Sequence, residues 1–382
     1  METDPLMIEQ IPRHYPCLDG LRGIAILLVV PHNADITVPV LHGPFALFTV
    51  LIDRGWVGVQ LFFVLSGFLI TEQLYRSRHA ANYMSGFYAR RVLRIVPLFC
   101  AAVVLALVLV KVMPSREVVA PTPAWLLWFG ILVVNWTEPL GMGMPALPQF
   151  WSLALEEQFY LIWPFVVRAF ASGLLGVSLA IAAVALAARI CMLLLGANTS
   201  MLYMWTISRV DALAFGAVAA IMVQRWRVRG HVPASWPWIA GGALIALCGA
   251  LMTRLYATGT WSTQTVGFTC LGLACMLILL GAVASDLSLQ PRRPLSVLRS
   301  RVLASVGRYS YGMYVFHLFF AIFAAAWVRR VVAPFGDARM VACALLMLAL
   351  SYALGFLSYH LYEKHFLRVG RRYFEPREPV VT

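Results

Sequence analysis

The sequence predicts an all-α polytopic membrane protein with about ten transmembrane helices around a polar central cavity, plus one short re-entrant or interfacial segment. Hydrophobic residues make up 61% of the chain and charged residues only 12%, a balance that excludes a soluble domain. Stretches of about twenty residues, such as 174–195 and 268–284, carry at most one charged residue. This length and composition are typical of a helix that crosses a bilayer.

Ten apolar segments are predicted to cross the membrane: 20–40, 57–74, 95–112, 150–167, 174–195, 203–224, 237–256, 265–284, 305–328 and 340–362. The apolar segment 125–136 is too short to cross and is followed by three prolines, so we expect it to be re-entrant or interfacial. The arginine-rich segments 76–94, 225–229, 292–301 and 368–372 should be cytoplasmic, which places both termini inside. Residues 1–372 are then one membrane domain and residues 373–382 a short cytoplasmic tail.

The net charge of +13 is carried almost wholly by arginine. These arginines cluster at the ends of the predicted spans, where the positive-inside bias and anionic lipid headgroups favour them. Membrane lipids are therefore expected partners and nucleic acid is not. The seven cysteines form no CxxC pair, and none lies near a histidine at metal-ligand spacing, so no metal site is predicted.

The first apolar segment carries Arg22 and His32, which lie about 15 Å apart along a helix. Ionisable side chains are costly at membrane depth and usually mark a functional path. The alternative is that Arg22 is a cytoplasmic anchor and His32 an interfacial residue.

A second polar group lies in WSLALEEQFYLIWP, residues 151–164. Ser152 and Glu156 share a helical face, whereas the adjacent Glu156 and Glu157 point about 100° apart and cannot both face one partner. A helix start, with Ser152 as N-cap and acids in the first turn, would explain the serine and one glutamate.

Three further groups are candidates for binding. Arg90, Arg91 and Arg94 lie at the expected cytoplasmic mouth of their span, where they could bind phosphate groups or simply anchor the helix. Arg209 and Asp211 are two residues apart, so they should pair with other helices, with Glu156 or Glu157 as options for Arg209, or contact a substrate. The polar stripe Ser310, Tyr314 and His317 is predicted to line a cavity.

Seven motifs in the same order resemble the acyltransferase-3 family of integral membrane O-acyltransferases, in the form without a fused extracellular esterase-like domain. They are LDGLRGIA (18–25), GWVGVQLFFVLSGFLIT (55–71), RRVLRIVPL (90–98), WSLALEEQFYLIWP (151–164), SRVDALAFGA (208–217), VGRYSYGMYVFH (306–317) and SYHLYEKHF (358–366). The resemblance implies a bacterial inner-membrane enzyme that takes an acyl group, commonly acetyl, from cytoplasmic acyl-coenzyme A. The acceptor would be a hydroxyl of a surface carbohydrate or lipid-linked glycan, or a macrolide-type small molecule.

The resemblance also implies roles for the candidate residues. His32 would be the general base, oriented by Glu156 or Glu157, and Arg22 would bind an anion or hold the site's geometry. Coenzyme A would be bound by Arg90, Arg91 and Arg94. An acyl-histidine relay across the bilayer is a second possibility. Contacts with substrate are assigned to Ser152, Arg209, Asp211, Tyr311, Tyr314 and His317.

One spacing departs from the family pattern. The histidine usually follows the arginine by eleven positions, and here it follows by ten, which turns His32 about 80° away from Arg22 on a regular helix. Pro31 could rewind the helix locally. Two alternatives to an enzyme are a transporter or flippase that uses the intramembrane His, Glu and Arg residues as a relay, and a scaffold without catalysis.

Overall fold

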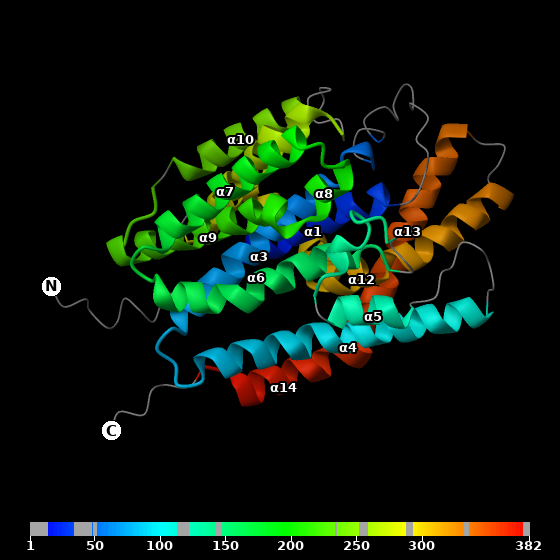
Figure 1. The fold of residues 1–382 in the computed structure, drawn as a ribbon, viewed down its shortest axis with the longest axis horizontal. Helices are drawn as coiled ribbons and strands as arrows, with labels where there is room; N and C mark the ends of the chain where they lie inside the picture. The colour runs from blue at the N-terminus through cyan, green and yellow to red at the C-terminus, as the bar shows by residue number, and fades with distance from the viewer. Residues whose placement is uncertain are drawn as a thin grey trace.

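The computed structural model describes residues 14–33, 48, 52–112, 122–130, 132–142, 147–233, 235–251, 259–287, 293–331 and 336–376. Within these ranges every regular element is helical (Figure 1), which confirms the predicted all-α class. Six of the described helical segments are long and apolar enough to cross a membrane: Val57–Arg76, Tyr83–Val112, Leu174–Leu194, Thr199–Arg229, Thr263–Leu287 and Val341–Phe374. The chain is therefore an integral membrane protein with multiple spans.

Helices α1 (Pro16–His32) and α3 (Val57–Arg76) lie at the centre of the bundle (Figure 1). Helix α1 packs against α12 (Arg301–Val331), and α3 packs against α9 (Thr206–Arg229). The α3–α9 contact needs glycine, because a Cβ on Gly67 would collide with the backbone carbonyl of Leu213. Small residues let helices approach closely in a membrane, where apolar burial alone does not favour one helix neighbour over lipid.

Helix α4 (Tyr83–Val112) begins twelve residues before the span that was predicted to start at residue 95. Its first turns are held by the bundle, because Tyr83 and Phe87 are buried and the Tyr83 hydroxyl donates to the Pro164 carbonyl at 3.0 Å. The end of the predicted basic loop is therefore helical, and Arg91 and Arg94 lie on a helix that packs into the protein.

The short apolar segment folds as helix α5 (Pro123–Gly130) and a 3₁₀ turn (Val134–Trp136). Eight residues of helix rise about 12 Å, too little to cross a bilayer, as predicted. The Phe129 ring stacks on Phe99 of α4 with the ring centroids 3.6 Å apart, so the segment packs against the bundle.

Near the C-terminus, α13 (Gly336–Ser358) runs through a π-helical turn (Tyr359–Glu363) into α14 (Lys364–Phe374). Helix α14 lies beside α4 (Figure 1), so the first residues of the predicted tail belong to a packed helix. The predicted first span, 20–40, extends into residues 34–47, which lie outside the described ranges. The other α-helices are α6 (Phe150–Ala169), α7 (Leu174–Leu194), α8 (Thr199–Met204), α10 (Trp236–Leu251) and α11 (Phe268–Leu287).

Candidate functional site

A cavity of about 600 Å³ lies among α1, α3, α4, α6 and α12. Its lining includes His14 and Pro376, which come from the two ends of the described chain, and we call this the terminal end of the cavity. From there the cavity follows α3 over almost its whole length, from Arg76 to Val59. At the terminal end, His14 and Arg76 are exposed to solvent, so this end is the mouth.

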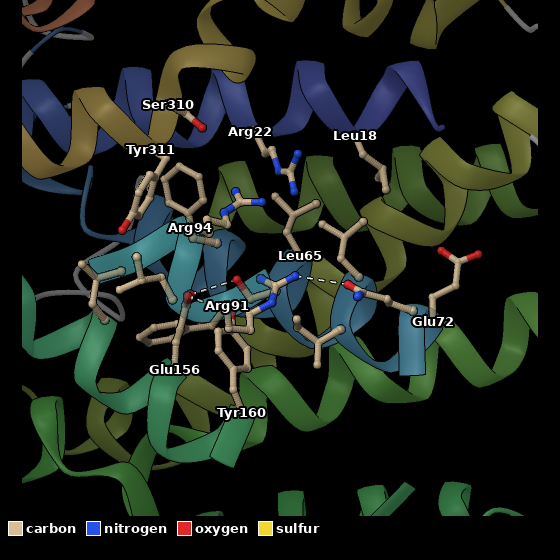
Figure 2. A pocket seen from close by; sticks show the side chains of 18 of the residues that line it. Leu18, Arg22, Leu65, Glu72, Arg91, Arg94, Glu156, Tyr160, Ser310 and Tyr311 are labelled. Carbon is tan, nitrogen blue, oxygen red and sulfur yellow. Dashed lines mark hydrogen bonds between the residues drawn. The ribbon is translucent and has the colours of Figure 1, made fainter. Parts of the chain in front are cut away.

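Three arginines point into the middle of the cavity from two helices (Figure 2): Arg22 of α1, and Arg91 and Arg94 of α4. The Asp19 carboxylate, one turn before Arg22 on the same helix, lies within ion-pair distance of Arg22 at 3.5 Å. Among the residues that the structure describes, no carboxylate lies within that distance of Arg91 or Arg94. We call these three residues the arginine cluster. Its positive charge is only partly balanced, so it can bind an anion.

Uncharged partners hold the arginine cluster in place. The Arg91 guanidinium donates to the side-chain carbonyl of Gln73 at 3.2 Å and lies over the ring of Tyr160 at 5.5 Å from its centroid. Arg94 lies 5.7 Å from the centroid of the Tyr311 ring. Contacts of this kind orient a guanidinium and leave most of its donors available.

Glu156 of α6 faces the arginine cluster across the cavity (Figure 2). Its carboxylate accepts hydrogen bonds from the hydroxyls of Ser66 and Tyr160, each at 2.9 Å. Glu157 does not line the cavity, and its Oε1 atom is buried without a hydrogen-bond partner. The two glutamates therefore face different surroundings, as the turn of the helix requires.

The inner end of the cavity is closed by a pair of hydroxyls from α6 and α12. The Ser152 and Tyr314 oxygens are 2.5 Å apart, and the Tyr314 hydroxyl also donates to the Gln149 carbonyl at 3.0 Å. Ser310 and Tyr311 line the cavity one turn closer to the mouth. Four of the residues that were predicted to contact substrate or line a cavity are thus gathered here.

Two histidines lie beyond this end and do not line the cavity. His317 is fully buried, and its Nδ1 donates to the Tyr314 carbonyl at 2.7 Å, which leaves Nε2 without a partner. Nδ1 of His32 donates to the Ile52 carbonyl at 2.7 Å. Because a carbonyl only accepts, each neutral imidazole carries its lone pair on Nε2.

The position of His32 follows from the helix that carries it. Helix α1 is α-helical from Pro16 through Pro31 to His32, so its regular turn persists and Arg22 and His32 face different directions. The carbonyl of Ile52 holds the imidazole, in the role that was predicted for Glu156 or Glu157. The structure therefore does not bring His32 together with the arginine cluster or the glutamates.

Three more predicted site residues lie away from the cavity. Arg90 turns toward α14 and donates to the Phe374 carbonyl, because it lies about 100° around the helix from Arg91. Arg209 is fully buried and donates to Gln60 at 2.7 Å, so neither Glu156 nor Glu157 is its ion-pair partner. Asp211 pairs instead with Arg189 of α7 at 2.8 Å. In the described part of the chain, Arg209 and Asp211 thus contact other helices, α3 and α7, and form no ion pair with each other.

Several residues at the site were missed by the sequence analysis. At the mouth, the Glu72 carboxylate accepts hydrogen bonds from Arg76 at 2.6 Å, from Tyr15 at 2.9 Å and from Arg227 of α9. The spacing of Glu72 and Arg76 is typical of a helical ion pair and could have identified them. Tyr160 could have been found as well, since it lies one helical turn after Glu156.

A family model described as an acyltransferase domain matches residues 15–362. The chain belongs to the acyltransferase-3 family. Curated relatives include the peptidoglycan O-acetyltransferase OatA of Listeria monocytogenes, which is 26% identical over 324 residues, and the O-acetyltransferase OatA of Staphylococcus aureus, which is 25% identical over 333 residues. These matches cover 80% of this chain and 49% and 50% of the two relatives, so the chain spans about half of their length. No solved structure matches the chain.

Proposed function

We propose that this protein is an O-acyltransferase that moves an acyl group, most simply acetyl, from cytoplasmic acyl-coenzyme A to a hydroxyl of a surface carbohydrate or lipid-linked glycan. The observation that carries the proposal is the cavity among α1, α3, α4, α6 and α12, with the arginine cluster at its centre. Membership of the acyltransferase-3 family supports the reaction class, and the two OatA relatives, both O-acetyltransferases, support acetyl as the group.

The donor would enter through the mouth and place its diphosphate at the arginine cluster. Planar guanidinium groups bind phosphate oxygens through paired hydrogen bonds, and such charge-assisted bonds are about twice as strong as neutral ones. Arg22, Arg91 and Arg94 offer these donors with little competition from carboxylates. Glu156 would hold part of the cluster in position and limit its self-repulsion, a role different from orienting the base.

His32 is the proposed general base. Its Nδ1–H is fixed by the Ile52 carbonyl, so Nε2 is free to take the proton of the acceptor hydroxyl. The oxygen then attacks the thioester carbonyl, the carbon–sulfur bond breaks, and the thiolate recovers the proton from the imidazolium. The products are an O-acyl ester and coenzyme A, and the histidine is restored.

The proposed topology follows from charge. Ten spans in the inner membrane of a bacterium, with the terminal end of the bundle in the cytoplasm, place the arginine-rich segments and the cavity mouth on the side where acyl-coenzyme A is made. His32, at the opposite end of α1, would then lie nearer the outer surface, where the glycan is.

The first test uses purified protein in liposomes supplied with acetyl-coenzyme A labelled in the acetyl group. We expect release or transfer of the label and a loss of at least about 100-fold in turnover for His32→Ala, since a positioned base contributes roughly 10²–10⁴-fold. Label that crosses the membrane still attached to coenzyme A would contradict the proposal and support a transporter.

Donor binding is tested by a matched pair of neighbours on α4. Arg91→Gln should raise the KM for acetyl-coenzyme A about tenfold or more and leave the KM for the acceptor nearly unchanged, because a hydrogen bond to a charged group contributes about 1.5–3 kcal/mol. Arg90→Gln removes the same charge from a residue that contacts α14, so its donor KM should change little. Equal changes of the donor KM in both variants would leave these residues only an anchoring role.

Mass spectrometry of surface glycans, with and without the intact protein, would identify the acceptor.

A further inference from the structure

The arginine cluster and the histidines lie on opposite sides of a closed barrier. The inner end of the cavity that contains Arg22 is lined by Val59, Ser152 and Tyr314, and the next side chain along this face of α12 is His317. The Tyr314 and His317 rings pack with their centroids 5.5 Å apart, and His32 is the last residue of α1, which packs against α12. A molecule that enters through the mouth therefore meets Tyr314 before it can reach either imidazole.

The length of acyl-coenzyme A from its phosphate to its sulfur indicates that the thioester has to pass this barrier. In acyl-coenzyme A, about twelve bonds separate the phosphate ester oxygen from the sulfur, the backbone length of four extended residues, or roughly 14 Å. Arg22 and His32 lie on the same unbroken helix, and ten residues of helix rise about 15 Å. A diphosphate bound at the arginine cluster would thus deliver its thioester to the level of His32, on the far side of Tyr314.

Tyr314 is held in a way that permits movement. Its ring is restrained in the barrier by polar contacts with Ser152 and the Gln149 carbonyl, and by an edge contact with Phe62 at a centroid distance of 6.3 Å. Both hydrogen bonds are made by the Tyr314 hydroxyl and the third contact by its ring. A rotation of the Tyr314 side chain therefore breaks no backbone hydrogen bond within a helix. After such a rotation, the hydroxyl can exchange these partners for groups of the donor.

We propose that Tyr314 is a gate residue that separates the donor cavity from His32 and His317 and that must turn aside for the thioester to reach the base. This inference rests on the proposed function for its purpose, but the barrier itself can be tested without turnover. While no donor is bound, Tyr314 also keeps cytoplasmic water away from the far side.

The test places a thiol beyond the gate. The His32→Cys variant, in inverted membrane vesicles, is treated from the cytoplasmic side with sulfonatoethyl methanethiosulfonate, a thin anionic reagent that suits the arginine cluster. Labelling at position 32 is then read by mass spectrometry, which distinguishes it from the native cysteines. We expect at least tenfold faster labelling when Tyr314→Ala is added, and an intermediate rate with Tyr314→Phe, which keeps the ring and removes both hydrogen bonds.

A control thiol on the cavity side separates a gate from a general loosening of the bundle. Ser66→Cys lies in the cavity lining before the gate and should label at the same rate with or without Tyr314→Ala. If Tyr314→Ala does not fold, Ser152→Ala together with Tyr314→Phe still tests the barrier. Labelling of the thiol at position 32 at one rate in all backgrounds would overturn the gate, whether that rate is fast or negligible. That result would leave the acyl-transfer proposal standing, because the latter is decided by turnover.

Discussion

Two sets of arginines inside this bundle have opposite surroundings. Arg189 of α7 is fully buried and donates to the Asp211 carboxylate at 2.8 Å, to the Thr265 carbonyl at 3.3 Å, and to the Ser208 carbonyl. The arginine cluster, by contrast, lines a cavity, and among the described residues its three members have one weak carboxylate contact, from Asp19 at 3.5 Å. The guanidinium donors of Arg189 are thus bonded to protein groups, whereas the described structure leaves most donors of the arginine cluster available to a ligand.

The difference indicates which charges serve the fold and which serve a ligand. A cation that is buried with its carboxylate and carbonyl partners is neutralised locally, and it fixes how α7, α9 and α11 pack. Cations that face a cavity without such partners keep their positive potential for an incoming anion. Variants that remove one member of each set should therefore change different properties of the protein.

The largest effect on stability is expected at the ion pair of Arg189 and Asp211. Arg189→Met leaves the Asp211 carboxylate buried without its cation, which should cost about 3–5 kcal/mol of unfolding free energy. Denaturant or thermal unfolding of the purified protein in detergent measures the loss. The double variant Arg189→Met with Asp211→Leu should recover most of it, because removing both partners also removes the uncompensated charge. A single variant as stable as the native protein would contradict the structural role.

A much smaller effect on stability is expected at the arginine cluster. Arg94→Gln removes one of three neighbouring positive charges, and no carboxylate in the described part of the chain loses an ion-pair partner. The unfolding free energy should change by less than about 1 kcal/mol, and relief of repulsion between like charges favours an increase. The same unfolding assay applies. A loss as large as that of Arg189→Met would mean that both sets of arginines serve the fold, and the comparison would fail.

The sequence predicted one set of arginines better than the other. Arg22, Arg91, Arg94 and Glu156 were all site candidates, because ionisable groups are rare in apolar helices and their spacing puts Arg91 and Arg94 on one face. Their roles came from the family resemblance. The same spacing rules put Arg90 and Arg94 on one face equally well. Only the packing of α14 against α4 decides that Arg90 leaves the cavity, and this contact joins residues far apart in the chain.

Long-range pairing explains the other differences. Arg189 is the one charged residue in an apolar stretch, which could have identified it, but its partner Asp211 lies on another helix. The contact between Arg209 and Gln60 joins α9 and α3 in the same way. Local sequence determines which face of a helix a residue occupies, whereas the partner depends on how the helices pack.

The central claim is that the arginine cluster binds the phosphates of the acyl donor, and direct binding of coenzyme A without turnover tests it best. Isothermal titration of the purified protein should give a Kd that rises about 10- to 100-fold in Arg94→Gln, since a charge-assisted hydrogen bond contributes about 1.5–3 kcal/mol. The Kd should stay near the native value in Arg90→Gln, whose guanidinium contacts α14. If coenzyme A binds equally well to the native protein and to both variants, the arginine cluster is not the donor site.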